Sequence, residues 1–213
     1  MRILEAFRAA GSKFKAELTN RFEEDTRIKI RGDVFFTMRD GKTGEVQLQR
    51  QEQNLVVLDA SILLARLIKD NQEPPFGSYV LAVGSGDSGW DLQNPPAATD
   101  TQRALYSEIT RKTFSSTEFI NSGGVSVAYP TNIVDFTTTF TESEAVGPLV
   151  EMGLVGGNID TNLAVKNPVS PPNGTYDDTV DLTAYETLLN YLTFAVVNKP
   201  ATSTLTITWR LTL

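Results

Sequence analysis

The sequence predicts a mainly β protein, an antiparallel β-sandwich of the jelly-roll type with an N-terminal amphipathic helix and one further helix near residues 59–69. Beyond residue 75, short runs of alternating apolar and polar residues are separated by turns rich in Gly, Pro and Asn, and most threonines lie there. The length of 213 residues, 40% of them hydrophobic, suffices for one domain with its own core. We therefore divide the chain into a helical arm, 1–25, and a β-sandwich domain, 26–213.

The first 25 residues are predicted to form an amphipathic helix, because their apolar residues recur at steps of three and four. These residues are Ile3, Phe7, Ala10, Phe14, Leu18 and Phe22. The cations include Arg2, Arg8, Lys13 and Lys15, and residues 1–21 hold five cations and two carboxylates, a net charge of +3. The helix either packs on its own domain or is an assembly arm that docks on a neighbouring subunit. A membrane-surface helix is a third alternative, disfavoured because the apolar face is thin and lacks Trp. We adopt the arm as the hypothesis.

From Arg27 the period of the apolar residues changes to two, which predicts a β-hairpin with its turn at 40–44. A helix over residues 59–69 follows, because apolar residues return to helical spacing. Asp59 and Ser61 are candidate N-terminal caps of this helix, and a pair of prolines ends it. Its many apolar residues indicate that it lies in the core.

Seven further strands are predicted from alternating, β-branched sequence. They span 78–83, 105–114, 117–128, 132–141, 149–155, 190–197 and 204–213. The last strand alternates most regularly, with Trp209 on its apolar face. The stretches 86–102 and 157–180 are predicted to be long loops, and long loops on a scaffold of strands usually form contact surfaces. The predicted contact residues in these loops are Asp87, Trp90, Tyr176, Asp177 and Asp178.

The composition excludes much of enzyme chemistry, because the chain has neither histidine nor cysteine. Disulfides, thiol nucleophiles, Cys/His zinc sites and the Ser–His–Asp relay are therefore impossible. We expect no enzymatic activity, no cofactor and no metal. The net charge of −7 disfavours nucleic acid as a partner. The N-terminus lacks the apolar core of a signal peptide and no apolar run approaches 20 residues, so we expect no membrane association.

The segment Gly84–Gly89 resembles two functional motifs. It matches the glycine pattern of dinucleotide-binding loops, but Pro95 and Pro96 follow where the required helix would begin. It also resembles the segment around a trypsin-like nucleophile, which is weak without a histidine base. We interpret its glycines as a sharp turn from a strand into a long loop.

Two groups of carboxylates are candidate sites. Asp160, Asp177, Asp178 and Asp181 offer oxygen ligands for Ca²⁺, but their spacing fits no EF-hand, and a solvated acidic loop is the simpler interpretation. Glu142, Glu144 and Glu151 offer a carboxylate pair for glycoside hydrolysis, but the sequence gives no sign of a sugar cleft. Glu151 is instead a candidate partner for Arg111 or Arg103; an exposed pair of this kind contributes only about 0–1 kcal/mol, so we interpret it as at most a device that sets strand register.

Several segments in a fixed order resemble a class of virion structural proteins of tailed bacteriophages, found in tails, baseplates and necks. The segments are Asn54–Asp59, Leu81–Gly86, Thr99–Arg111 with Leu105 and Glu108, Phe136–Leu154 with Glu151 and Gly153, and the terminal strand that contains Trp209. The similarity covers about 54–213. It implies a β-sandwich virion protein that assembles with others of its kind.

We therefore expect a non-enzymatic structural component of a virion, assembled in the host cytoplasm. Its expected partners are copies of itself, in a symmetric homo-oligomer, and other virion proteins, which it contacts through the arm and the long loops. Two alternatives stay open: a receptor- or glycan-binding appendage that uses the long loops, and a capsid decoration protein.

Overall fold

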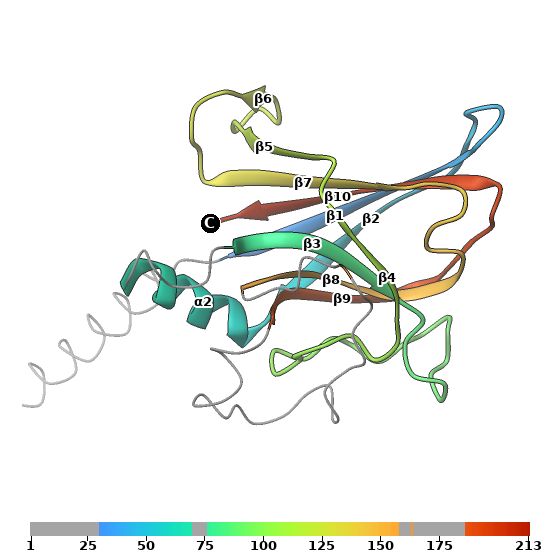
Figure 1. Ribbon diagram of the computed structural model, residues 1–213, viewed down its shortest axis with the longest axis horizontal. Coiled ribbons are helices and arrows are strands. Elements are labelled where there is room, and N and C mark those ends of the chain that lie inside the picture. Colours follow the sequence, from blue (N-terminus) through green and yellow to red (C-terminus); the bar gives the residue numbers. More distant parts are fainter. Residues whose placement is uncertain (1–29, 70–75, 158–162, 164–185) are drawn as a thin grey trace, which may run out of the picture. The chain divides into compact units, whose positions relative to one another are not determined.

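The computed structural model describes residues 30–69, 76–157, 163 and 186–213. The predicted arm, 1–25, lies outside them, and the described fold lies in the compact unit Arg31–Thr212. Its elements are β1 (Arg31–Asp40), β2 (Val46–Val56), α2 (Leu58–Lys69), β3 (Phe76–Gly84), β4 (Glu108–Thr113), β5 (Ser116–Ile120), β6 (Ser126–Val127), β7 (Ile133–Phe140), β8 (Gly147–Gly157), β9 (Glu186–Lys199) and β10 (Ser203–Thr212) (Figure 1). None of the described helical residues forms a segment both long and apolar enough to cross a bilayer.

The described strands form one antiparallel hydrogen-bonded series in the order β4-β3-β8-β9-β2-β1-β10-β7-β5-β6. Strand β2 joins its two halves. Along most of its length β2 pairs with β1, as far as Asn54 opposite Gly32, whereas Leu55 and Val56 pair with β9. Strands β2 and β9 therefore diverge beyond this short contact, and the series bends there.

One hydrophobic cluster draws residues from both halves of the series. On one side are Val34 and Phe36 of β1 with Leu205, Ile207 and Trp209 of β10; on the other are Leu81 and Val83 of β3, Met152 and Leu154 of β8, and Leu192 and Phe194 of β9. The rings of Phe36 and Phe194 meet edge to face with centroids 5.1 Å apart. The prediction of a mainly β chain with a large antiparallel sheet is confirmed, while the sandwich or jelly-roll arrangement stays a prediction.

The predicted helix is confirmed as α2, which begins one residue earlier than expected. Leu63 is buried in the shared cluster, whereas Leu58 and Leu64 are exposed, so the helix is half in the core rather than enclosed by it. The prediction that Ser61 caps the N-terminus is wrong: its hydroxyl donates to the carbonyl oxygen of Leu58 at 2.7 Å, one turn back, as serines inside helices do.

The predicted hairpin is formed by β1 and β2. Asp40 orders its turn, since the carboxylate accepts hydrogen bonds from the amides of Lys42 and Thr43 at 2.9 and 2.8 Å. The predicted strand 117–128 is instead two short strands, β5 and β6. They are separated by a turn in which the side chain of Asn121 accepts bonds from the amides of Gly123 and Val125.

Strand β10 confirms the most regular prediction. Leu205, Ile207 and Trp209 are fully buried, while Thr206 and Thr208 between them are only partly buried. The alternation is the direct result of the two-residue period of an extended strand with one face on the core. It weakens only at the C-terminus, where Leu213 is about half exposed.

Candidate functional site

The structure places two of the predicted contact residues, Asp87 and Trp90, in the segment 85–107 between β3 and β4, here called the β3–β4 loop. The other predicted site residues lie outside the described residues. They are the contact residues Tyr176, Asp177 and Asp178, the arm residues Ile3, Phe7, Phe14, Leu18, Phe22, Arg2, Arg8, Lys13 and Lys15, and the acidic residues Asp160 and Asp181. The candidate site is therefore built from the β3–β4 loop and the sheet that carries it.

Glu151 ties the two ends of this loop together. It lies on β8 and is fully buried. Its Oε1 accepts hydrogen bonds from the amide of Gly86 at 3.1 Å and from that of Ser107 at 2.8 Å. Its Oε2 accepts from the amide of Tyr106 at 2.9 Å and from the hydroxyl of Tyr191 at 2.6 Å. One carboxylate thus joins the first and last residues of the loop to two neighbouring strands of the sheet.

This arrangement corrects two predictions about Glu151. The residue is fully buried, and its hydrogen-bond donors are backbone amides and a phenol rather than Arg111. The carboxylate also has no path to a sugar: its two oxygens are occupied by four donors beneath the loop. The interaction keeps a buried charge stable because amide dipoles replace the water that burial removes.

Two glycines leave room for the carboxylate and its loop. A Cβ on Gly84 would lie 2.5 Å from Oε1 of Glu151 and equally close to the carbonyl oxygen of Ser107. A Cβ on Gly86 would lie 2.5 Å from the ring of Trp90, and Gly86 has a φ of +70°, which disfavours any other residue. The positive φ of Gly86 agrees with the predicted role of the glycines in a turn, whereas Gly84 is the last residue of β3 and is required by the close approach of the carboxylate.

The surroundings of Glu151 also change the pKa of Tyr191. Burial raises the pKa of its phenol, and the nearby negative charge of Glu151 raises the pKa further. The hydroxyl therefore stays protonated and serves Glu151 as a permanent donor.

The two predicted contact residues of the loop also have structural roles. The ring of Trp90 meets that of Tyr106 edge to face, with centroids 4.7 Å apart, and the side chain is partly buried. The carboxylate of Asp87 accepts a hydrogen bond from the amide of Gly89 at 2.8 Å, which orders the tip of a turn. Asp87 is exposed and remains available at the surface, whereas Trp90 is held against its own loop.

Further hydrogen bonds fasten the middle of the loop to the sheet and to α2. The amide of Val196 on β9 donates to the carbonyl oxygen of Leu92 at 2.8 Å, and the hydroxyl of Thr193 donates to that of Pro96 at 2.7 Å. Near its end, the carbonyl oxygen of Asp100 accepts from the amide of Leu58. Leu92 thereby occupies the edge of β9 that β2 leaves open, so the loop presents a defined surface.

A second buried charge network lies beside the end of the loop. Arg111 on β4 donates to both carboxylate oxygens of Glu108 at 2.5 and 2.6 Å, and to both of Glu186 on β9 at 2.6 and 2.8 Å. Burial alone would lower the pKa of the guanidinium, but the bonds to the two carboxylates outweigh it and raise the pKa. The network fixes the edge strand β4 to the start of β9.

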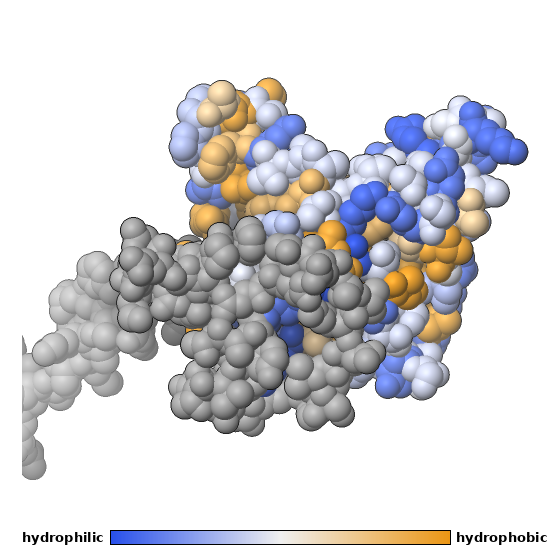
Figure 2. Space-filling view, viewed as in Figure 1, coloured by the Kyte–Doolittle hydropathy of each residue, from blue (hydrophilic) through white to orange (hydrophobic). Residues whose placement is uncertain are grey.

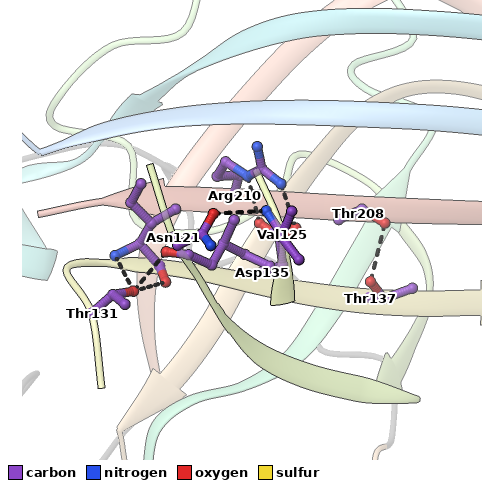
Figure 3. A network of polar contacts seen from close by, with 9 residues as sticks. Asn121, Val125, Thr131, Asp135, Thr137, Thr208 and Arg210 are labelled. Carbon is purple, nitrogen blue, oxygen red and sulfur yellow. Dashed lines mark hydrogen bonds and ion pairs between the residues drawn. The ribbon is translucent and has the colours of Figure 1, made fainter. Parts of the chain in front are cut away.

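Polar side chains cover the outer face of β7 and β10 (Figure 3). Asp135 and Arg210 form a two-point ion pair at 2.7 and 2.8 Å, and the hydroxyls of Thr137 and Thr208 lie 3.0 Å apart. The guanidinium of Arg210 also lies 5.6 Å from the ring centroid of Phe35 on β1. This face is a cross-strand ladder whose groups satisfy one another.

The β5–β6 hairpin at the end of the series carries exposed apolar side chains. Phe119, Val125 and Tyr129 are 37%, 60% and 60% exposed, and apolar residues gather at the surface over these two strands in Figure 2. Three of the nine exposed large apolar side chains of the described residues thus come from eleven residues. We name these three residues the hairpin patch.

The other carboxylates proposed for catalysis are not assembled into an acid–base pair with Glu151. Glu144 binds Lys112 at 2.6 Å and also accepts the amide of Thr141. Among the ranges that the structure describes, no three acidic side chains are grouped so that they could hold a metal ion.

Sequence reasoning missed the central role of Glu151 and its bond to Tyr191. A signal was present, because Glu151 is the one charged residue in the apolar run 149–155. A carboxylate inside such a run is buried and must be supplied with donors. Which donors these are depends on pairing between distant strands, which the run itself does not encode.

Comparison of the sequence with the models of known protein families and with curated proteins gives no match.

Proposed function

We propose that the chain is a non-enzymatic structural component of a tailed-phage virion, in the tail, baseplate or neck. It assembles with copies of itself and with other virion proteins through its N-terminal segment and its long loops. Its place of assembly is the host cytoplasm, and it requires no cofactor.

One observation carries the proposal: residues from the separate segments of the resemblance meet around the base of the β3–β4 loop. Glu151 binds the loop beside Gly84 and Gly86. Leu105 lies against Gly153, and it lines a small pocket together with the ion-paired Glu108 and Arg111. These segments are distant in sequence but neighbours in the described fold, which supports the proposal.

The chemistry of that unit supports a role in contacts. Its charged groups are saturated by internal partners, with four donors on Glu151 and two carboxylates on Arg111. Such groups hold a loop in one conformation and leave no free acid or base for a reaction. A loop held in this way is suited to binding a neighbouring protein without ordering costs.

Mass spectrometry of purified phage particles, separated into heads and tails, tests the proposal. We expect the chain in the tail fraction, in several copies per particle. Its absence from particles would overturn the proposal, and its presence in heads alone would favour a decoration protein.

The isolated chain gives a second test. We expect rings in negative-stain microscopy and no retention on glycan columns. Retention of a stable monomer on a glycan column would instead support the receptor-binding alternative.

A further inference from the structure

We infer that the hairpin patch is the docking site for the N-terminal segment, residues 3–22, of a neighbouring copy of the chain. This inference rests on the proposed function, in which copies assemble, and adds the surface on which they meet. The segment itself lies outside the described residues, so the inference is argued from the patch, from where the chain enters the fold, and from the sequence.

The patch needs a partner because its apolar side chains are presented at the end of the strand series. Phe119 of β5 lies opposite Val127 of β6, the outermost strand. Val125 and Tyr129 flank β6 in sequence. Val125 and Tyr129 are more than half exposed. Clustered apolar side chains of this kind usually mark an interaction surface.

The strand register places the start of the described fold level with the patch. Gly32 lies opposite Leu211, Leu211 opposite Val134, Val134 opposite Phe119, and Phe119 opposite Val127. This row crosses four strand spacings, roughly 19 Å at ~4.8 Å each. The described fold of every copy therefore begins, at Arg31, at the same end of the strands as its patch.

The segment and the patch are complementary in chemistry. The segment presents Phe7, Phe14 and Phe22 at helical spacing and carries a net charge of +3 over residues 1–21. Residues 113–134, which contain the patch, hold a single charged side chain, Glu118. The predicted amphipathic helix offers aromatic side chains to Phe119 and Tyr129, and the stretch 113–134 contains no Lys or Arg that would repel its cations.

We assign the occupant to a second copy because the proposed function requires copies to assemble, and because arm and patch, being two different surfaces, allow a head-to-tail contact. A contact that joins unlike surfaces of identical chains runs head to tail, and its repetition forms a ring when the rotation between copies closes and a helical filament when it does not. In such a ring each arm covers one patch, and each patch receives one arm. This meets the symmetry that the proposed function requires.

Site-specific cross-linking of the full chain tests the inference, since the native sequence has no cysteine. Two singly substituted proteins, Phe14→Cys and Val125→Cys, are mixed and treated with a short bis-maleimide. We expect a cross-linked pair that contains one chain of each kind. Val46→Cys replaces Val125→Cys in the control: Val46 is 49% exposed but lies opposite Arg39, at the other end of β1, and should give no link.

Other results would overturn the inference. A link within one chain of the doubly substituted protein at high dilution would place the segment on its own patch. A link between two copies of the Val125→Cys variant would indicate a patch-to-patch contact. Oligomers that persist without any link at position 125 would remove this docking site but leave the proposed function intact, whereas a strictly monomeric native chain would remove both.

Self-association supplies a readout that needs no cross-linker. Val125→Ser combined with Tyr129→Ser should raise the dissociation constant of the oligomer at least about tenfold, because two apolar side chains lose their burial. Both positions are more than half exposed, so the substitutions leave the fold intact, which circular dichroism checks. Val46→Ser should leave the dissociation constant unchanged; an equal effect of Val46→Ser would contradict the inference.

Discussion

Glu151 is a buried carboxylate that is held by three backbone amides and a phenol. Isolated charges of this kind are strongly disfavoured inside proteins, and amides with fixed positions make them tolerable because their dipoles need no reorganisation. The corollary is that the site accepts only a group with four acceptor positions. A side chain that brings its own N–H sets donor against donor.

Glu151→Gln should therefore destabilise the fold although it keeps the shape of the side chain. One of its two terminal atoms becomes an NH₂ group facing two donors, and leaving buried donors unpaired costs roughly 1–3 kcal/mol. The free energy of unfolding in urea measures the loss. Glu118→Gln is the matched control, since Glu118 is exposed on β5 and its replacement should change stability by under about 0.5 kcal/mol. Equal stability of the two variants would show that the network contributes nothing.

The buried phenol of Tyr191 makes the free energy of unfolding depend on pH. Burial and then the charge of Glu151 raise the pKa of this phenol above the value of 10.0 that it has when exposed. Its contribution to stability is complete below pH 10 and is lost as the pH rises further, because the unfolded chain then releases the proton while the folded chain keeps it. Above pH 10 the native chain should lose stability relative to Tyr191→Phe at a rate that rises to roughly 1.4 kcal/mol per pH unit by pH 11.5.

The comparison needs a second tyrosine. Tyr129→Phe removes a phenol that is 60% exposed, and this variant should follow the native profile. A Tyr191→Phe profile parallel to that of the native chain would show that the phenol is not held protonated by the fold. At pH 7 the same variant should be less stable by about 1 kcal/mol, for the hydrogen bond to Glu151.

At the scale of elements, the β3–β4 loop is held by its ends, its middle and its aromatic packing. Gly86 connects these features, since its amide binds Glu151 and its Cα lies under Trp90. The backbone conformation of Gly86 and the ring above it both exclude a side chain. The loop should therefore be sensitive at this one position and tolerant at exposed ones.

Gly86→Ala should destabilise the protein more than Gly124→Ala. Both glycines have positive φ, +70° and +79°, so both substitutions cost about 1 kcal/mol of backbone strain. A Cβ at Gly124 meets nothing within 4 Å, whereas at Gly86 it collides with Trp90 and Val150. The difference between the two free energies of unfolding measures the collision, about 1–3 kcal/mol. A shift in tryptophan fluorescence should accompany Gly86→Ala alone, and equal losses would contradict the packing described for Trp90.

The elements themselves could be predicted because each depends on a local period. The alternation of β10 and the helical spacing of α2 lie within about twelve residues, and the turn at Asp40 is encoded by Asp and Gly. The pairing of Glu151 with residues 44 and 45 positions away is not local, and neither is the choice of Glu186 as partner of Arg111. The expected Glu151–Arg111 pair is not formed, because the strand register places Arg111 opposite Ala82 of β3 and Glu151 opposite Gly84, two residues further along.

At the scale of the whole described fold, a single hydrophobic cluster joins both halves of the strand series. Strand order was beyond sequence reasoning, because β2 serves both halves and β9 follows long after it in the chain. Neither half can bury its inner face without the other. The two halves should therefore lose structure together.

Urea unfolding should follow one transition whichever half is observed. Trp209 reports on β10 in one half, and Trp90 reports on the loop carried by the other. Single-tryptophan variants, Trp90→Phe and Trp209→Phe, allow each probe to be read alone. Because Trp209 is fully buried, the Trp209→Phe variant is less stable than the native chain. The unfolding midpoint measured by fluorescence is therefore compared with the midpoint measured by circular dichroism within the same variant. Separate midpoints within either variant would show that the halves unfold independently.

The closure of the β3–β4 loop by Glu151 has a consequence for engineering. Since the carboxylate clamps residues at both ends of the loop, the distance between those ends is fixed by the sheet and not by the residues in between. Lengthening a loop with fixed ends adds only a slowly growing entropy, about 0.6 kcal/mol per doubling. The exposed stretch between Leu92 and Pro95 is thus a suitable place to graft a foreign epitope, because Glu151 holds the two ends of the loop in place.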